Sequence, residues 1–220
     1  MPLRELLAVF DEETEPARNL VREEDIFAKV ERGELPEVLR FWKNAECLIR
    51  GKVRNQRYGW YDEALAAKMK VPVHERSTGG GVVYMDLGNL NWSFFLRASG
   101  AFLSPATLFD RASVHFVRAL RRMGFDADLA PPNRIEVSGK KVSGMAARST
   151  RRAHLVHGTL LIHTNLERLN SLCIPPGGCP PVSNLIEWSA KASPEGVREA
   201  VLQDLVESGY SVRKVDGLQV

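Results

Sequence analysis

Residues 75–91 read ERSTGGGVVYMDLGNLN, and this stretch decides how the middle of the chain is built. Three consecutive glycines at 79–81 separate two apolar runs, 71–75 and 82–85, which we predict to be strands. Glycine loses more conformational freedom on folding than any other residue, and a simple hairpin needs only one or two. The triple glycine therefore indicates a bare backbone surface against which a ligand can lie, with a glycine-rich turn as the alternative. Arg76, just before it, faces either solvent or an anion.

A second polar segment, NRIEVSGKKVSG at 133–144, carries the adjacent residues Lys140 and Lys141. Neighbours on a strand point to opposite faces, so one lysine can be solvated while the other enters a pocket. A lysine in a pocket can stabilise a carboxylate, a phosphate or the developing charge of a mixed anhydride. Two surface lysines on a strand edge are the alternative. His157, in LVHGTLL at 155–161, is either a core histidine or a site residue.

Helices and strands alternate irregularly along the chain, which favours an α+β fold with a central mixed sheet flanked by helices. The clearest helix is 105–123, with Ser104 as its cap and Pro105 at its first position. We predict further helices at 17–32, 61–69 and 194–208. We predict strands at 37–42, 71–75, 82–85 and 91–96, and a run of short strands over 135–163 that includes 155–162. Residues 210–220 are expected to form a short tail.

Composition narrows the class of protein. The chain has 220 residues, which suits one sizeable domain. Its formal net charge of +3, from 30 Lys+Arg and 27 Asp+Glu, does not argue for nucleic-acid binding. No apolar run is long enough to span a bilayer, and the N-terminus lacks the features of a signal peptide, so we expect a cytoplasmic protein without membrane contact. The sequence has no CxxC pair, so we do not expect a structural zinc site. Cys173 and Cys179 either stay free or form a local disulfide.

Taken together, these segments resemble the lipoate–protein ligase family, within the superfamily that includes biotin ligases and octanoyltransferases. RSTGGGVVYMDLGNLNWSF at 76–94 is similar to R-R-x-x-G-G-G-x-V-x-H-D-x-G-N, and NRIEVSGKKVSGMA at 133–146 to N-D-x-x-V…K-x-x-G-x-A. LVHGTLL is similar to the H-H-G-T-L-L that follows, and order and spacing agree over roughly 17–190. The resemblance implies a fold of the class II aminoacyl-tRNA synthetase and biotin ligase type.

The resemblance also implies a reaction in two steps. Lipoate attacks the α-phosphate of ATP, helped by Mg²⁺, and the lipoyl-adenylate then acylates a lysine on a lipoyl domain of a 2-oxoacid dehydrogenase complex or on the glycine cleavage H protein. Lys141 matches the catalytic lysine. Asp86 is a candidate metal ligand. The residues that match the lipoate- and ATP-binding positions are Arg76, Gly79, Gly80, Gly81, Asn89, Asn133, Gly144 and His157.

The sequence departs from these motifs at Met85 and Val156, where the family has histidines, and at Arg134, where it has an aspartate. Two other functions therefore stay open: an octanoyl or lipoyl transferase that uses a cysteine thiolate, and a lipoyl-binding module without catalysis. Single-chain relatives often carry a small C-terminal domain. We expect 1–220 to be one catalytic-type domain without it, and a separate small accessory subunit to be a candidate partner.

Overall fold

The computed structural model describes residues 3–52 and 56–217. Its centre is an eight-stranded sheet with the order β13-β1-β2-β7-β11-β10-β9-β8. Strands β13, β1 and β2 are parallel and the other neighbouring pairs are antiparallel, so the sheet is mixed, as predicted. The strands are β1 (Arg4–Phe10), β2 (Glu37–Trp42), β7 (Asn89–Arg97), β8 (Ala127–Ala130), β9 (Arg134–Val137), β10 (Lys140–Ser149), β11 (Ala153–Leu161) and β13 (Tyr210–Asp216).

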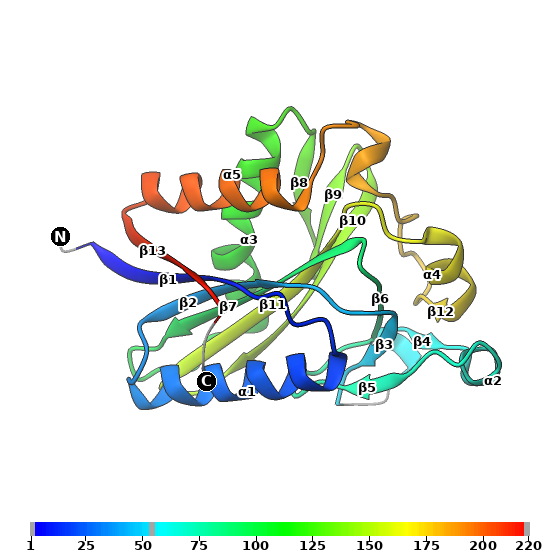
Figure 1. Ribbon diagram of the computed structural model, residues 1–220, viewed down its shortest axis with the longest axis horizontal. Helices are drawn as coiled ribbons and strands as arrows, with labels where there is room; N and C mark the ends of the chain where they lie inside the picture. The colour runs from blue at the N-terminus through cyan, green and yellow to red at the C-terminus, as the bar shows by residue number, and fades with distance from the viewer. Residues whose placement is uncertain (1–2, 53–55, 218–220) are drawn as a thin grey trace.

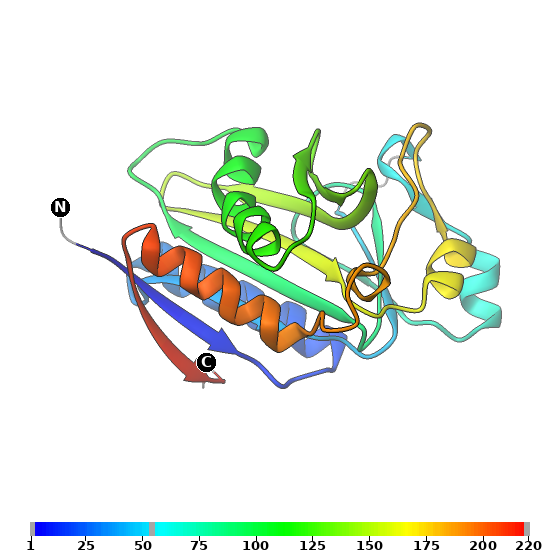
Figure 2. The same ribbon diagram turned by 90° about the horizontal axis from the view of Figure 1, so that it is seen from above.

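Helices cover both faces of this sheet. Helix α1 (Pro16–Arg32) lies on one face, and α3 (Pro105–Arg122) and α5 (Pro194–Glu207) lie together on the other (Figure 1, Figure 2). The N-caps of α3 and α5 confirm the sequence prediction, because the Ser104 and Ser193 side chains accept hydrogen bonds from backbone N–H groups of the first turn. A proline follows each cap, where its missing N–H costs nothing.

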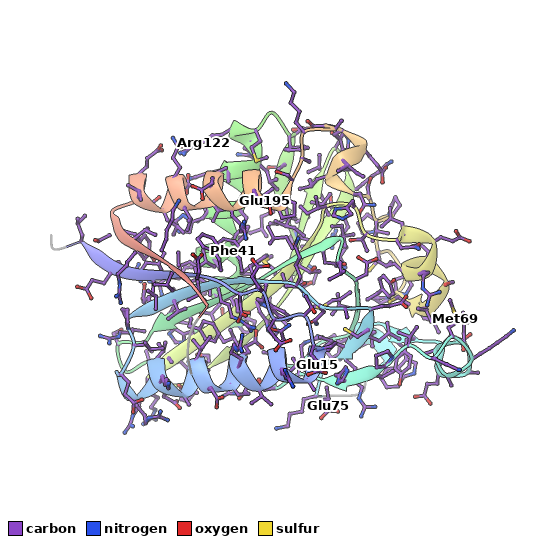
Figure 3. All side chains as sticks on the ribbon, in the orientation of Figure 1. Glu15, Phe41, Met69, Glu75, Arg122 and Glu195 are labelled. Atoms are coloured by element: carbon purple, nitrogen blue, oxygen red, sulfur yellow. The ribbon has the colours of Figure 1, made fainter. Side chains whose placement is uncertain are left out.

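The two faces of the sheet differ in character. The α3–α5 face is mostly apolar: Trp92 stacks on Phe116 with ring centroids 4.3 Å apart, and Phe41, labelled in Figure 3, packs in the same layer. The α1 face is apolar around Phe27 and Phe95 only. Its other part carries polar side chains that are also buried, namely Asn89, Asn91, Ser93, His157 and Thr159. Burial of this many polar groups on one face marks the place of a site.

A smaller three-stranded sheet lies at one end of the central sheet (Figure 1). In it β3 (Cys47–Arg50) pairs in parallel with β5 (Val73–Glu75) and antiparallel with β6 (Val82–Met85). The glycine turn at 79–81 therefore joins β5 to β6. The other elements are β4 (Trp60–Tyr61), which pairs with β12 (Cys173–Ile174), helices α2 (Glu63–Lys68) and α4 (Leu166–Leu172), and short 3₁₀ turns at Gln56–Tyr58 and Leu185–Glu187.

The sequence prediction of a short tail at 210–220 is wrong over its first part. Tyr210–Asp216 forms β13, which adds to the edge of the sheet in parallel with β1, itself not predicted from the sequence. Tyr210 and Val212 pack against the α3–α5 layer, while Val215 packs against the α1 layer. Only three of the seven residues of β13 are apolar, which is too weak a local pattern to predict a strand. The segment is a strand because it pairs with β1.

The described part of the chain includes no helix that is both long enough and apolar enough to cross a membrane.

Candidate functional site

The glycine turn is held from within by Arg76. Its guanidinium donates to Thr78 Oγ1 at 2.9 Å, to the carbonyl of Ile49 at 3.1 Å, and to the carbonyls of Gly79 and Gly81 at 2.9 Å each. The side chain is buried. Of the two orientations that the sequence left open, solvent is wrong, because the cation points at the carbonyls of its own turn. Arg76 therefore fixes the shape of the surface that the glycines form.

The three glycines of the turn have different surroundings. Gly80 has φ +99°, which residues with a side chain rarely adopt. A Cβ on Gly81 would overlap the carbonyl of Tyr58, because the backbone of the neighbouring loop passes directly against it. Around Gly79, in contrast, no atom of the described chain lies within 4 Å of where a Cβ would stand. The turn thus presents open space at Gly79, a left-handed backbone at Gly80 and close backbone packing at Gly81.

A buried hydrogen-bond relay joins the turn to helix α1. Thr78 Oγ1 lies 2.7 Å from Nε2 of His157, and His157 Nδ1 lies 3.0 Å from both carboxylate oxygens of Glu23. Ser93 Oγ donates to the same carboxylate at 2.5 Å and accepts from the indole of Trp42 at 3.0 Å. His157 is thus bonded on both ring nitrogens, which goes beyond a core histidine with one partner. The relay sets the position of the turn relative to the sheet.

Electrostatics in this relay favour a charged carboxylate. Burial alone would raise the pKa of Glu23, but the charge of His157 and the hydrogen bonds from His157 and Ser93 outweigh it, so its pKa is lowered. Burial lowers the pKa of Arg76 to about 10, opposed by the charge of Glu23. The two ionised side chains therefore stabilise each other across the turn.

A pocket of about 260 Å³ opens between α1 and residues 75–77, which directly precede the glycine turn. Leu20, Glu23 and Glu24 of α1 form one wall, and Arg76 and its neighbours form the other. Figure 3 labels Glu75, which also lines the pocket, at the end of β5. The pocket is lined by Glu23 of the relay and by Arg76, so the space lies directly against residues that shape the turn.

Lys140 and Lys141 have opposite surroundings, as their adjacent places on a strand predict. Lys140 Nζ lies 3.7 Å from the carboxylate of Glu187 and faces solvent in part. Lys141 is folded back over Gly144, where a Cβ would lie 3.3 Å from both its Cε and its Nζ. Gly144 therefore leaves the room that the Lys141 ammonium occupies. Because Gly144 pairs with Thr159, the ammonium lies on the polar part of the α1 face.

The surroundings of Lys141 lower the pKa of its ammonium group. Burial lowers the pKa of this lysine, the thiols of Cys179 and Cys173 oppose the shift, and the nearby charge of Arg134 adds to it. Burial raises the pKa of Cys173 to about 12 even beside this lysine. Both cysteines are free thiols, so the local disulfide that the sequence left open is not formed.

Asn133 and Arg134 lie next to this lysine along the sheet. Asn133 exchanges hydrogen bonds with Met145, its Nδ2 donating to the Met145 carbonyl and its own carbonyl accepting from the Met145 N–H at 2.9 Å. Arg134 donates to the carboxylate of Glu136 at 2.5 Å and to the carbonyl of Pro131. The structure therefore places a second cation close to Lys141, where the compared family motif has an aspartate.

Asn89 and Asp86 organise the chain after β6. Asn89 donates to Thr159 Oγ1 at 2.9 Å and accepts from the Asp86 N–H at 3.0 Å. The Asp86 carboxylate accepts from the N–H groups of Gly88 at 2.8 Å and Asn165 at 2.9 Å. Over residues 3–52 and 56–217, no group of three or more His, Cys, Asp or Glu side chains could hold a metal ion. The Asp86 carboxylate thus orders the loop, and its role as a metal ligand stays a prediction.

Sequence analysis missed two residues of this site. Glu23 occupies a position on the apolar side of the predicted helix, three residues after Leu20 and four before Phe27. A charged residue within such a stripe is a signal of a buried partner, and it could have been found. Thr78 lies inside the quoted glycine segment, but no local pattern shows that its hydroxyl meets His157, which is 79 residues away in the chain.

Comparison with solved structures places the fold. The crystal structure of a lipoate-protein ligase A bound with ATP superposes with a TM-score of 0.84 at 26% identity, covering 98% of this chain and 90% of that one. A Thermoplasma acidophilum protein described as a putative lipoate protein ligase with bound lipoic acid gives 0.83 at 24% identity, covering 99% and 91%. The predicted fold, a mixed sheet with helices on both faces of the kind found in this superfamily, is confirmed.

Sequence comparison defines the family. Residues 15–206 match the lipoyl protein ligase A/B catalytic domain. The chain therefore belongs to the lipoyl protein ligase A/B catalytic domain family. One relative, the lipoate-protein ligase A of Psychrobacter cryohalolentis, is 31% identical over 205 residues, which cover 86% of this chain and 56% of the relative. The chain thus spans about half the length of the curated relatives it matches.

Proposed function

We propose that this chain is the catalytic domain of a lipoate–protein ligase that activates lipoate with ATP. The observation that carries the proposal is the ammonium of Lys141, held over Gly144 on the same face of the sheet as the glycine turn. A cation there can stabilise the charge that develops as the carboxylate of lipoate attacks the α-phosphate and pyrophosphate leaves. Membership of the family and the ATP bound to a lipoate-protein ligase A of the same fold support this reaction.

In the second step the ε-amine of a lysine attacks the acyl carbon of lipoyl-AMP, an amide forms, and AMP leaves. We infer that the acceptor is a lipoyl domain of a 2-oxoacid dehydrogenase complex or the glycine cleavage H protein. A structure from Thermoplasma acidophilum that shares this fold at a TM-score of 0.82 is described as coming from the structural analysis of a bipartite lipoate protein ligase and its E2 lipoyl domain. We therefore include a separate accessory subunit among the proposed partners.

The proposal predicts ATP-dependent lipoylation. We expect the protein, mixed with a lipoyl domain, lipoate and Mg-ATP, to add one lipoyl mass to the acceptor and to release pyrophosphate. The reaction is run with and without a separate accessory subunit. Mass spectrometry of the acceptor, with ATP omitted in a parallel reaction, makes the measurement.

The cysteines provide the control against a thiolate transferase. The pKa of Cys173 is raised to about 12, so its thiolate is scarce at neutral pH, and a thiol is a poor nucleophile. We therefore expect the Cys173→Ser, Cys179→Ser double variant to keep its lipoylation activity. Transfer from an acylated carrier that needs no ATP and disappears in the double variant would establish the transferase instead.

The glycine turn allows a second test, in which affinity and stability separate. Gly79→Ala places a methyl group in open space, so we expect a change in unfolding free energy within about 0.5 kcal/mol. If the turn is a wall of the acyl pocket, the methyl group should lower lipoate affinity by roughly tenfold. Calorimetry and thermal melting measure the two quantities.

Gly80→Ala is the matched variant. Its φ of +99° and the Arg76 guanidinium 3.1 Å from the added Cβ should cost about 1–3 kcal/mol of stability. The glycine-wall proposal is wrong if Gly79→Ala binds lipoate as tightly as the unmodified protein does.

A further inference from the structure

One row of residues crosses four strands on the α1 face of the central sheet. Trp42 of β2 pairs with Asn91 of β7, Asn91 pairs with Thr159 of β11, and Thr159 pairs with Gly144 of β10. Residues that lie directly opposite each other on antiparallel strands project to the same face. The Lys141 ammonium stands over the Gly144 end of this row. The row therefore leads from the proposed reaction centre to Trp42.

Asn91 is an exception in this row. Its side chain is fully buried, and neither Nδ2 nor Oδ1 has a hydrogen-bond partner among the residues that the structure describes. The residues two positions before and after it on the same face, Asn89 and Ser93, are both hydrogen-bonded. A buried amide without partners is costly to a fold, since it loses its bonds to water. A molecule bound along the row would supply the missing partner.

The geometry of the sheet limits how that molecule lies. Gly144 and Asn91 are two strand spacings apart, which is about 10 Å. This distance is comparable to the length of an octanoyl chain. An acyl group whose carboxyl carbon is at the Lys141 ammonium therefore brings its far end to Asn91 when it lies along the row.

We propose that Asn91 determines which acyl chain is accepted, by recognising a sulfur-bearing far end. The inference rests on the proposed function and deepens it. The Nδ2–H group would donate to a dithiolane sulfur, which is a weak acceptor. A plain alkyl end offers no acceptor, so it would leave the amide unpaired inside the complex. The residue thus favours lipoate over octanoate, two acids that a purely apolar pocket separates poorly.

The test compares two acids on two proteins. Isothermal calorimetry of the full chain should show lipoate binding about tenfold more tightly than octanoate. Asn91→Leu replaces the amide with an apolar group of similar size, so lipoate affinity should fall and octanoate affinity should rise, and the ratio should drop at least about tenfold. An unchanged ratio in Asn91→Leu would overturn the assignment.

Control variants distinguish the role of Asn91 from a general effect of removing a buried polar group and from a failure of the proposed function. Ser113→Ala removes another buried, unpaired polar group, on α3 across the sheet, and should leave the lipoate to octanoate ratio unchanged. If Asn91→Leu does not fold, Asn91→Ala replaces it with the same expected loss of preference. If the unmodified protein binds lipoate but the ratio stays constant in the variants, only the role of Asn91 is refuted. If it binds neither acid, the proposed function fails with it.

Discussion

Replacing Lys141 with alanine is expected to lower lipoyl transfer by roughly 100- to 1,000-fold, the usual loss when one group that stabilises transition-state charge is removed. The Lys141 ammonium stands over Gly144 in a space that a Cβ would restrict, and no other lysine shares this position in the described chain. The variant should fold normally, because it removes a side chain whose charge is penalised by burial. The mass of the lipoyl-domain acceptor, sampled over time with Mg-ATP, measures the effect.

Lys140→Ala is the matched control. Its ammonium is 3.7 Å from the Glu187 carboxylate and partly in solvent, so its loss should change transfer little. The pH profile adds a second readout. Burial lowers the pKa of Lys141 from its ordinary value of 10.5. As the pH rises, the positive charge should therefore be lost, and activity should decline, at a pH lower than 10.5. Equal, small effects of the two alanine variants would refute the role of Lys141.

Glu23→Ala is expected to destabilise the protein by about 3 kcal/mol, the order of loss when one partner of a buried charged pair is removed. Glu23 is fully buried and accepts from His157 and Ser93, so its removal leaves His157 Nδ1 and the Ser93 hydroxyl without this acceptor in the core. Because the pKa of this carboxylate is lowered, its contribution is present above its ordinary value of 4.5 and is lost as the pH falls through the lowered one. Urea unfolding at neutral pH measures the difference.

The next residue along the helix supplies the control. Glu24 pairs with Arg148 at 2.7 Å, but both side chains are substantially exposed, so Glu24→Ala should cost about 0.5 kcal/mol or less. Only Glu23 belongs to the relay that positions Thr78 and the glycine turn, so the large loss of stability should be confined to Glu23→Ala. The relay has no structural role if the two alanine variants unfold at the same urea concentration.

Much of the fold was predictable because its signals are local. Ser104 and Ser193 precede prolines and stripes of apolar residues, and each begins a helix where expected. Strand β13 carries a weaker pattern. It becomes a strand because β1 satisfies its backbone hydrogen bonds at the edge of the sheet. A contact between residues 4–10 and 210–216 leaves no trace in either segment alone.

The sequence by itself determined that the chain carries a glycine-rich turn, and that Lys140 and Lys141 point apart, since strand geometry alternates faces at every residue. It also determined the family, because several motifs occur together in order. Only the tertiary structure decided that Arg76 turns into its own loop and that His157 meets Glu23, which is 134 residues away. It also left Asn91 buried without a partner. Such contacts depend on which faces are brought together by packing, and burial then raises the cost of every polar group left unpaired.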